Sequence, residues 1–137
     1  MSPDIEQKIR RSFAAQAMMT TLGARLVALS DGSTEIEAPI LPGSRQQHGF
    51  GHAGLTFAIG DSAAGYAALS LMPNEAEVLT TEMKINLLAP AQGERLIARG
   101  RVIKPGRRLV IVQADVFALK EGVETHIALL TGSMIPV

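Results

Sequence analysis

A chain of 137 residues, with 47% hydrophobic and 19% charged side chains, has enough apolar material for one packed domain. Thirteen basic and thirteen acidic residues cancel, so there is no overall positive field to hold a nucleic-acid backbone. The chain has no cysteine, which excludes disulfides, thiolate zinc sites and cysteine nucleophiles and suits a reducing cytoplasm.

An amphipathic helix is predicted over residues 4–19. Ile5, Ile9, Phe13 and Ala17 recur at four-residue spacing and therefore share one face. The charged start lacks the apolar region of a signal peptide, and no uncharged apolar run reaches about 18 residues, the length that spans a bilayer. We therefore expect a cytoplasmic protein without a membrane partner.

Two strands are predicted at residues 22–30 and 33–41. Asp31 and Gly32 stand between them, and Asp-Gly between such runs is a strong hairpin signal. Residues 41–54 are rich in glycine and polar side chains and are predicted to form a loop.

A second helix is predicted over residues 53–72, closed by Pro73. It has no polar stripe, and its many small residues would let other backbones approach closely, which is typical of a buried helix. Four further strands follow, separated by turns that contain glycine: 77–89, 94–104, 108–119 and 123–135.

This order of elements predicts an α+β fold, in which a curved antiparallel sheet wraps around one long buried helix. We expect a single domain over residues 1–137, with residues 1–20 as its N-terminal helix. Exposed strands at the edges of such a sheet predict pairing with a second copy.

Asp61 is the only charged residue between His52 and Glu75, and it lies on the predicted buried helix. Burying an unpaired carboxylate is costly, so the side chain is expected to be either paired at the helix rim or functional. A carboxylate in an apolar pocket has a raised pKa, which suits a general base or a nucleophile.

Residues 49–54 read Gly-Phe-Gly-His-Ala-Gly and match the spacing of the dinucleotide-binding fingerprint. No buried strand precedes them, so this interpretation is rejected. Glycines before a helix still leave backbone N–H groups free to face a ligand, and such donors stabilise an oxyanion.

Other catalytic motifs are missing from the sequence. His48 and His52 are four residues apart, but their glycine-rich surroundings do not predict the helix that would align them, so no metal site is expected. No serine lies in a G-x-S-x-G context, which excludes a nucleophile elbow. No cofactor is predicted.

A basic cluster covers the fourth predicted strand, 94–104, and the turn after it, with Glu94 as its only acidic neighbour. It is expected to be either a solvated turn or a clamp for phosphate groups, which arginine binds well. Its members are Arg95, Arg99, Arg101, Lys104, Arg107 and Arg108.

Taken together, these segments resemble the hotdog-fold acyl-CoA thioesterases of the phenylacetate-degradation, or PaaI-like, type, over nearly the whole chain after residue 20. Residues 52–54, His-Ala-Gly, with Asp61 and the small residues up to Tyr66, resemble the family's H-G-G motif and the D-[ST]-A segment behind it. Residues 82–90 and 106–109 resemble a family strand that ends in a proline turn and the hairpin that follows. The resemblance implies hydrolysis of acyl-CoA to free acid and CoA, by a homodimer or homotetramer.

The resemblance also implies roles for the loop and the helix. Asp61 matches the catalytic carboxylate, which activates water or attacks the thioester carbon. Ala53 replaces the first glycine of H-G-G, whose N–H polarises the thioester carbonyl, and a backbone donor survives this change. His52 shapes the loop, and Gly54 belongs to the substrate-binding part of it. In the family, the carboxylate and the N–H donor come from different subunits.

Further positions follow from the same resemblance. Gln46 matches an Asn or Gln before the motif histidine, with Gln47 as the alternative. Thr80 matches a hydroxyl that positions water in some members, whereas strand alternation favours Thr81, so both stay open. The hairpin residues expected to contact CoA phosphates are Lys104, Arg107 and Arg108.

Two other functions compete with thioester hydrolysis. Hotdog-fold enoyl-CoA hydratases use an Asp and a His about five residues apart, but position 66 is Tyr and no histidine follows Asp61 until His126. A non-catalytic acyl-CoA binding module has no use for a buried acid beside a carbonyl. The acyl group itself stays open, with these candidates for pocket or core: Phe50, Phe57, Tyr66, Met72 and Met83.

Overall fold

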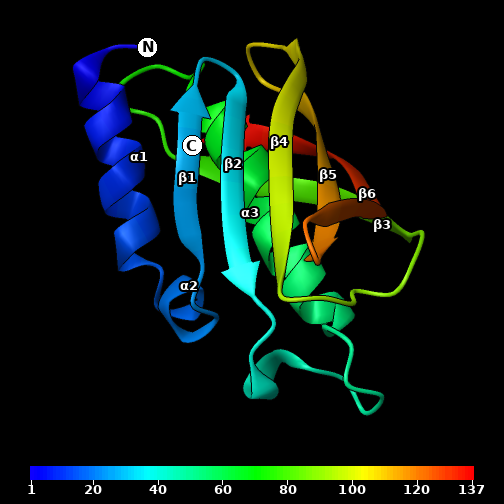
Figure 1. The fold of residues 1–137 in the computed structure, drawn as a ribbon. Helices are drawn as coiled ribbons and strands as arrows, with labels where there is room; N and C mark the ends of the chain where they lie inside the picture. Colours follow the sequence, from blue (N-terminus) through cyan, green and yellow to red (C-terminus); the bar gives the residue numbers. More distant parts are fainter.

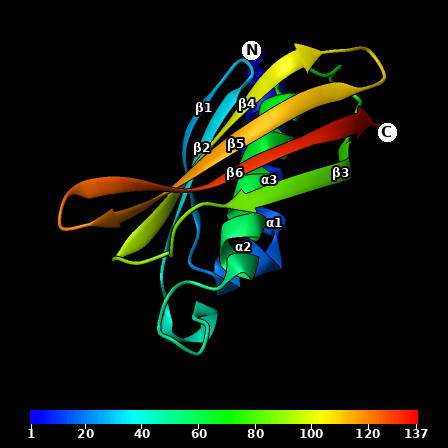
Figure 2. The ribbon, with the colours of Figure 1, turned by 90° about the vertical axis from the view of Figure 1, so that its right-hand side faces the viewer.

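The computed structural model describes residues 1–137 and has one six-stranded antiparallel sheet curved around a central helix (Figures 1 and 2). The sheet order is β1-β2-β4-β5-β6-β3, which leaves β1 and β3 as its edges. The elements are α1 (Pro3–Ala15), α2 (Ala17–Thr21), β1 (Arg25–Ser30), β2 (Ser33–Pro39), the 3-10 turn η1 (Pro42–Ser44), α3 (Ala53–Leu69), β3 (Val78–Leu87), β4 (Arg95–Pro105), β5 (Val110–Lys120) and β6 (Val123–Pro136).

The sheet and the central helix agree with the sequence prediction. Gly32 has φ +71° in the β1–β2 turn, a conformation that glycine adopts without strain. α3 ends at Leu69 rather than at residue 72, and residues 70–72 form a turn. None of the helices has both the length and the apolarity that crossing a membrane requires.

The N-terminal helix differs from its prediction, because it is two helices rather than one. Gln16 leaves the helical conformation between them, with φ −74° and ψ 99°. Its side-chain amide donates a 2.7 Å hydrogen bond to the hydroxyl of Tyr66 on α3. Ile9 is buried, whereas Ala17 is exposed and does not continue the apolar stripe. α1 lies alongside β1 (Figure 1).

Small residues let α3 lie very close to the sheet. A side chain at Gly100 of β4 would come within 2.3 Å of the Ala63 backbone, so only glycine fits there. Ala63, Ala64, Ala67 and Ala68 are all almost fully buried. Tight packing of this kind fixes the position of every other side chain on the helix.

One stripe of α3 is left uncovered by its own chain, which corrects the expectation of burial all round. Ala53, Gly54 and Phe57 are exposed, and Asp61 and Ser62 are partly exposed. These positions recur every four residues, so they face the same way. The predicted catalytic carboxylate and the predicted N–H donor therefore belong to one open face.

Candidate active site

Asp61 is paired with a hydroxyl from the neighbouring strand. Thr80 Oγ1 of β3 donates a 2.8 Å hydrogen bond to Asp61 Oδ1. Burial raises the pKa of the Asp61 carboxyl above its ordinary value, and the Thr80 hydrogen bond offsets part of that rise. No basic side chain forms an ion pair with this carboxylate. A carboxylate in this state is a better proton acceptor than a solvated one.

A β-bulge decides which of the two candidate threonines meets Asp61. The pairing of β3 with β6 shifts by one residue between Thr80 and Glu82, so Thr81 is the extra residue. Alternation counted back from the inward-facing Met83 and Ile85 places Thr81 inward, and the bulge reverses this. The Thr81 hydroxyl instead contacts Ser133, 2.8 Å away on β6.

The hollow around Asp61 has a volume of about 250 Å³ and is lined mainly by polar side chains. Two of them come from α1 and the residue after it, which the sequence did not single out. Ser12 and Gln16 both contact the Tyr66 hydroxyl, at 3.0 and 2.7 Å. Their four-residue spacing beside the apolar stripe of α1 is the signal that could have identified them. The N-terminal segment is therefore a wall of the hollow.

The start of α3 presents one free backbone donor. His52 is the N-cap residue, and its Nδ1 accepts a 2.7 Å hydrogen bond from the Gly54 N–H. The Gly54 N–H is therefore already occupied within the chain. The N–H groups of Leu55 and Thr56 both bond to the His52 carbonyl. Only the Ala53 N–H has no acceptor within the chain.

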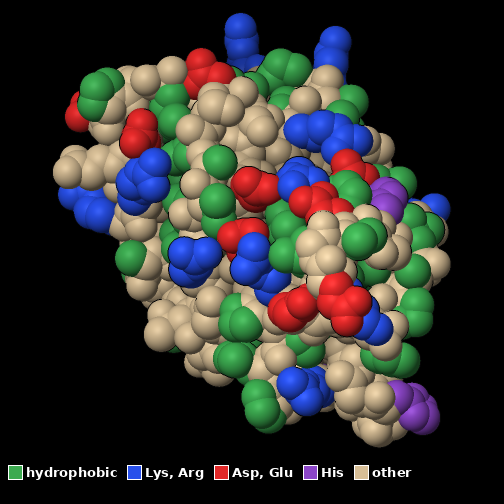
Figure 3. All heavy atoms as spheres, in the orientation of Figure 1, with side chains coloured by type: hydrophobic (Ala, Val, Ile, Leu, Met, Phe, Trp, Pro, Cys, Tyr) green, Lys and Arg blue, Asp and Glu red, His purple; other side chains and the backbone are tan.

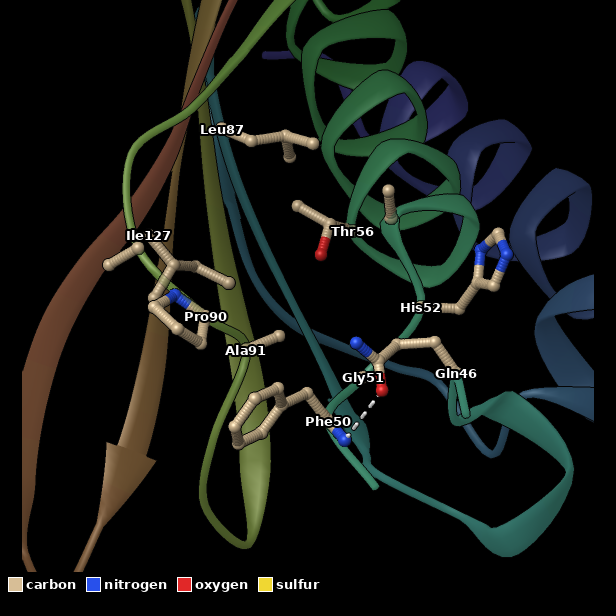
Figure 4. Close-up of a pocket in the computed structure, with 11 residues that line it drawn as sticks. Gln46, Phe50, Gly51, His52, Thr56, Leu87, Pro90, Ala91 and Ile127 are labelled. Carbon is tan, nitrogen blue, oxygen red and sulfur yellow. Dashed lines mark hydrogen bonds between the residues drawn. The ribbon is translucent and has the colours of Figure 1, made fainter. Parts of the chain in front are cut away.

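Gln46 is held so that its amide nitrogen faces the same place. Its Oε1 accepts hydrogen bonds from the backbone N–H groups of His48, at 2.5 Å, and Phe50, at 3.2 Å. The amide nitrogen is therefore turned into the pocket beside the helix start (Figure 4). Gln47 is exposed, lines neither hollow of the candidate site and makes no side-chain hydrogen bond, so Gln46 is the better of the two candidates.

This second pocket is mostly apolar and has a volume of about 380 Å³. Thr56 and the motif residues His52 and Ala53 form one side of it (Figure 4). The opposite side is formed by the end of β3, the proline turn and β6. Besides Ala53, the apolar residues that line the pocket are Phe50, Leu87, Ala89, Pro90, Ala91 and Ile127.

One chain does not bring the carboxylate and the free N–H together. Ala53 and Asp61 are eight residues apart on α3, about 12 Å at roughly 1.5 Å per residue. They also line different hollows. A reacting carbonyl has to lie about 3 Å from both its donors and the attacking group.

The basic cluster divides into two groups. Arg95, Arg99 and Arg101 lie on the outer face of the sheet and form ion pairs there. Arg95 pairs with Glu37 at 3.4 Å, and Arg99 pairs with Glu35 and Glu124, each at 2.8 Å. Arg101 pairs with Asp115. Acidic and basic side chains consequently alternate across this face (Figure 3). The residues at the β4–β5 tip make no ion pair, and they are Lys104, Arg107 and Arg108.

The other aromatic and methionine candidates are dispersed through the fold. Phe50 lines the apolar pocket, and Tyr66 lines the Asp61 hollow. Phe57 is exposed on the open stripe of α3, and Met83 packs against the core. Met72 is buried at the turn after α3.

Comparison with known proteins identifies the fold and the class of chemistry. Residues 48–125, more than half of the chain, match the thioesterase superfamily model. The chain belongs to the thioesterase superfamily. It is a hydrolase, and thioester hydrolysis is the general activity of this superfamily.

Two solved structures are similar to this thioesterase over almost its whole length. The crystal structure of a thioesterase family protein from Silicibacter pomeroyi is 47% identical, with a TM-score of 0.95, over 97% of this chain and 98% of the other. The Escherichia coli PaaI protein of the phenylacetic acid degradation operon shares the fold, with a TM-score of 0.84 at 18% identity over 98% and 94% of the two chains. A Saccharolobus solfataricus protein with a provisional esterase name is 26% identical over 102 residues, 74% of this chain and 71% of its own.

Proposed function

We propose that this thioesterase hydrolyses acyl-CoA, with Asp61 as its catalytic carboxylate. The observation that carries the proposal is the Asp61–Thr80 pair, a carboxylate without a basic partner in a hollow that raises its pKa. The basic β4–β5 tip supports CoA as the leaving group, because three unpaired cationic side chains suit its phosphates. The cysteine-free chain suits the reducing cytoplasm, and the proposed chemistry uses only protein groups and water.

Two routes are open to Asp61. As a general base, it removes a proton from a water whose oxygen attacks the thioester carbon, while the Thr80 hydroxyl keeps the carboxylate in place. As a nucleophile, its oxygen attacks the same carbon, and water then cleaves the resulting anhydride. In both routes the carbonyl oxygen gains negative charge, the carbon–sulfur bond breaks, and the CoA sulfur ends with a proton.

The Ala53 N–H and the Gln46 amide are the proposed donors to the developing oxyanion. Both are free and face one apolar pocket, where a hydrogen bond to an oxyanion is stronger than in water. The acyl group would then extend along the apolar side of this pocket, towards Leu87 and Ile127.

We further propose that each site is shared between two subunits. Ala53 and Asp61 of one chain are about 12 Å apart along α3, which is too far for both to act on one thioester. A second copy with its α3 antiparallel would set Ala53 of one subunit against Asp61 of the other. The open stripe of α3 and the unpaired edge strand β3, with Leu79 and Leu87 exposed, offer surfaces for such a dimer.

The experiment that tests the function is a panel of acyl-CoA esters, assayed for release of free CoA. The panel should include short, medium-length and aromatic acyl groups, because the apolar pocket alone does not identify the acyl chain. We expect turnover of at least one ester by the parent protein and loss of turnover in Asp61→Asn. Binding of acyl-CoA without release of CoA would identify a binding module instead, and addition of water to an enoyl-CoA would identify a hydratase.

A further inference from the structure

A small cavity lies at the end of α3 opposite to the proposed oxyanion donors. It is bounded by the turn that follows α3 and by the β4–β5 hairpin, and its volume is about 250 Å³. Leu71, Met72, Pro105 and Val110 contribute apolar walls, and Arg107 is the only charged residue in its lining. A cavity of this size is below the usual range for drug-sized ligands, about 300–1,000 Å³, and suits one ring system.

The cavity and the Asp61 hollow share a wall. Val78 lines the hollow and Pro136 lines the cavity, and these two residues are directly opposite each other in the β3–β6 pairing. Directly paired residues point to the same side of a sheet. Asp61 lies eight residues before the end of α3 at Leu69, about 12 Å along the axis at roughly 1.5 Å per residue. Leu69 lines the hollow together with Asp61, and Leu71, two residues further on, lines the cavity. The hollow therefore runs from Asp61 to the neighbourhood of the cavity, and a chain-like molecule can follow it.

Uncompensated positive charge lies on the β4–β5 hairpin, which forms one side of the cavity. Lys104, Arg107 and Arg108 have no ion-pair partner, in contrast to the arginines on the outer face of the sheet. The backbone N–H groups of Arg107 and Arg108 also bond to no acceptor in the chain. Gly106 makes this tight tip possible, since a side chain there would come within 2.1 Å of the Leu109 carbonyl oxygen. An apolar slot rimmed by such donors suits a flat base attached to phosphates.

We infer that this cavity receives the adenine base of CoA. The phosphates then lie on the basic tip, and the pantetheine arm follows the hollow from Leu69 and Val78 to the thioester beside Asp61. This inference rests on the proposed acyl-CoA hydrolase function, and it adds a nucleotide subsite made by Leu71, Met72 and the hairpin.

The first test uses the unmodified protein and two fragments of the substrate. Adenosine 3′,5′-bisphosphate is the nucleotide portion of CoA, and inorganic pyrophosphate supplies phosphates without a base. We expect the nucleotide to inhibit acyl-CoA hydrolysis competitively, with an inhibition constant about tenfold lower than that of pyrophosphate, since burial of the apolar faces of one base contributes on this scale. Equal inhibition by the two compounds would overturn the inference, because only phosphate would then be recognised.

The second test fills the cavity. Leu71→Trp places a large ring in the slot, and Val123→Trp places the same side chain at an exposed position at the start of β6 as a control. With acyl-CoA, we expect KM to rise about tenfold in Leu71→Trp, with kcat unchanged, and no change in Val123→Trp. With the same acyl group on pantetheine, which lacks the nucleotide, both variants should match the parent protein.

The pantetheine ester separates failure of the inference from failure of the function. If the parent hydrolyses neither ester, the proposed function is wrong. If it hydrolyses both esters with the same KM, the proposed hydrolase function is retained, but the nucleotide subsite does not exist. A Leu71→Trp defect that is equal for both esters would show damage to the fold instead of loss of the base, and would also count against the subsite.

Discussion

The Thr80 hydroxyl reaches the Asp61 carboxylate because β3 carries one extra residue immediately after Thr80. Without that bulge, the alternation of β3 would point Thr81 at the helix. The bulge allows Val78 and Thr80 to face α3 at one end of the strand, and Met83 and Ile85 to face it at the other. The only hydrogen-bond donor that holds Asp61 therefore depends on an irregularity in the strand.

Asp61→Asn should abolish turnover while leaving substrate binding intact. The amide keeps the shape of the side chain and still accepts the Thr80 hydrogen bond, but it can neither take a proton nor form an anhydride. We expect kcat to fall at least about a hundredfold, the usual scale for loss of a general base. Steady-state kinetics measure the fall, and titration with acyl-CoA measures binding. A near-normal kcat would remove Asp61 from the mechanism.

Thr80→Val should move the acidic limb of the pH–rate profile to higher pH. The Thr80 hydrogen bond lowers the pKa of Asp61 against the larger effect of burial, so its removal lets the pKa rise further. Asp61 would then be protonated over more of the acidic range, and kcat/KM there should drop several-fold. Thr81→Val is the matched control, since Thr81 contacts Ser133 instead. If the acidic limb of the pH–rate profile does not move in Thr80→Val, or moves equally in both variants, the Thr80 hydrogen bond does not set the pKa of Asp61.

The same carboxylate should lower stability at neutral pH. The folded-state pKa of Asp61 is raised, so the folded protein binds the proton more tightly than the unfolded chain. Its contribution to stability is present at low pH and is lost as the pH rises through the folded-state pKa. Asp61→Asn should therefore increase Tm at about pH 8, by a few degrees at most because the carboxylate keeps some contact with solvent, and not at about pH 3.5. Thermal unfolding at the two pH values makes the comparison, and a variant less stable than the parent at pH 8 would contradict it.

Arg107→Ala and Arg108→Ala should raise KM for acyl-CoA with little change in kcat. Lost contacts between an exposed cation and a phosphate are expected to cost up to about fivefold in KM. The defect should shrink as salt is added, because screening weakens the attraction in the parent as well. Arg25→Ala is the control, since Arg25 is also exposed but lies on the outer face of the sheet in an ion pair with Glu37. If KM is unaltered in both hairpin variants, the tip is a solvated turn that does not bind CoA.

Subunit complementation should restore activity to a mixture of two inactive variants. Ala53→Pro removes the proposed donor N–H, and proline is well tolerated at the first position of a helix. His52 already has φ −66° and ψ 145°, the extended conformation required before proline. Asp61→Asn removes the carboxylate from the other half of the site.

After the two variants are denatured, mixed equally and refolded, random pairing gives about half heterodimers, each with one intact site of two. Roughly a quarter of the activity of refolded parent should return. A mixture that stays as inactive as its components, while the parent recovers, would place each site within one chain.

The sequence predicted every strand of the sheet and the buried helix to within three residues at each end, because hydrophobic periodicity and turn residues act locally. It did not predict the break at Gln16, since that residue leaves the helix while bonded to Tyr66, fifty positions away. The choice between Thr80 and Thr81 also lay beyond alternation, because a bulge has no signature in the side chains around it. The Gly54 N–H is occupied and the Ala53 N–H is free because of the orientation of the His52 imidazole ring. Residue identity alone does not predict that orientation.

The ion pairs on the outer face of the sheet have a consequence for how fast a substrate arrives. They cancel the field of Arg95, Arg99 and Arg101 locally, and the chain as a whole is neutral. An anion that approaches the β4–β5 hairpin from solution is consequently attracted to its tip and hardly to the paired arginines on the outer face of the sheet. The association rate constant for CoA esters should therefore fall with ionic strength as it does for a basic protein, although the net charge of this one is zero.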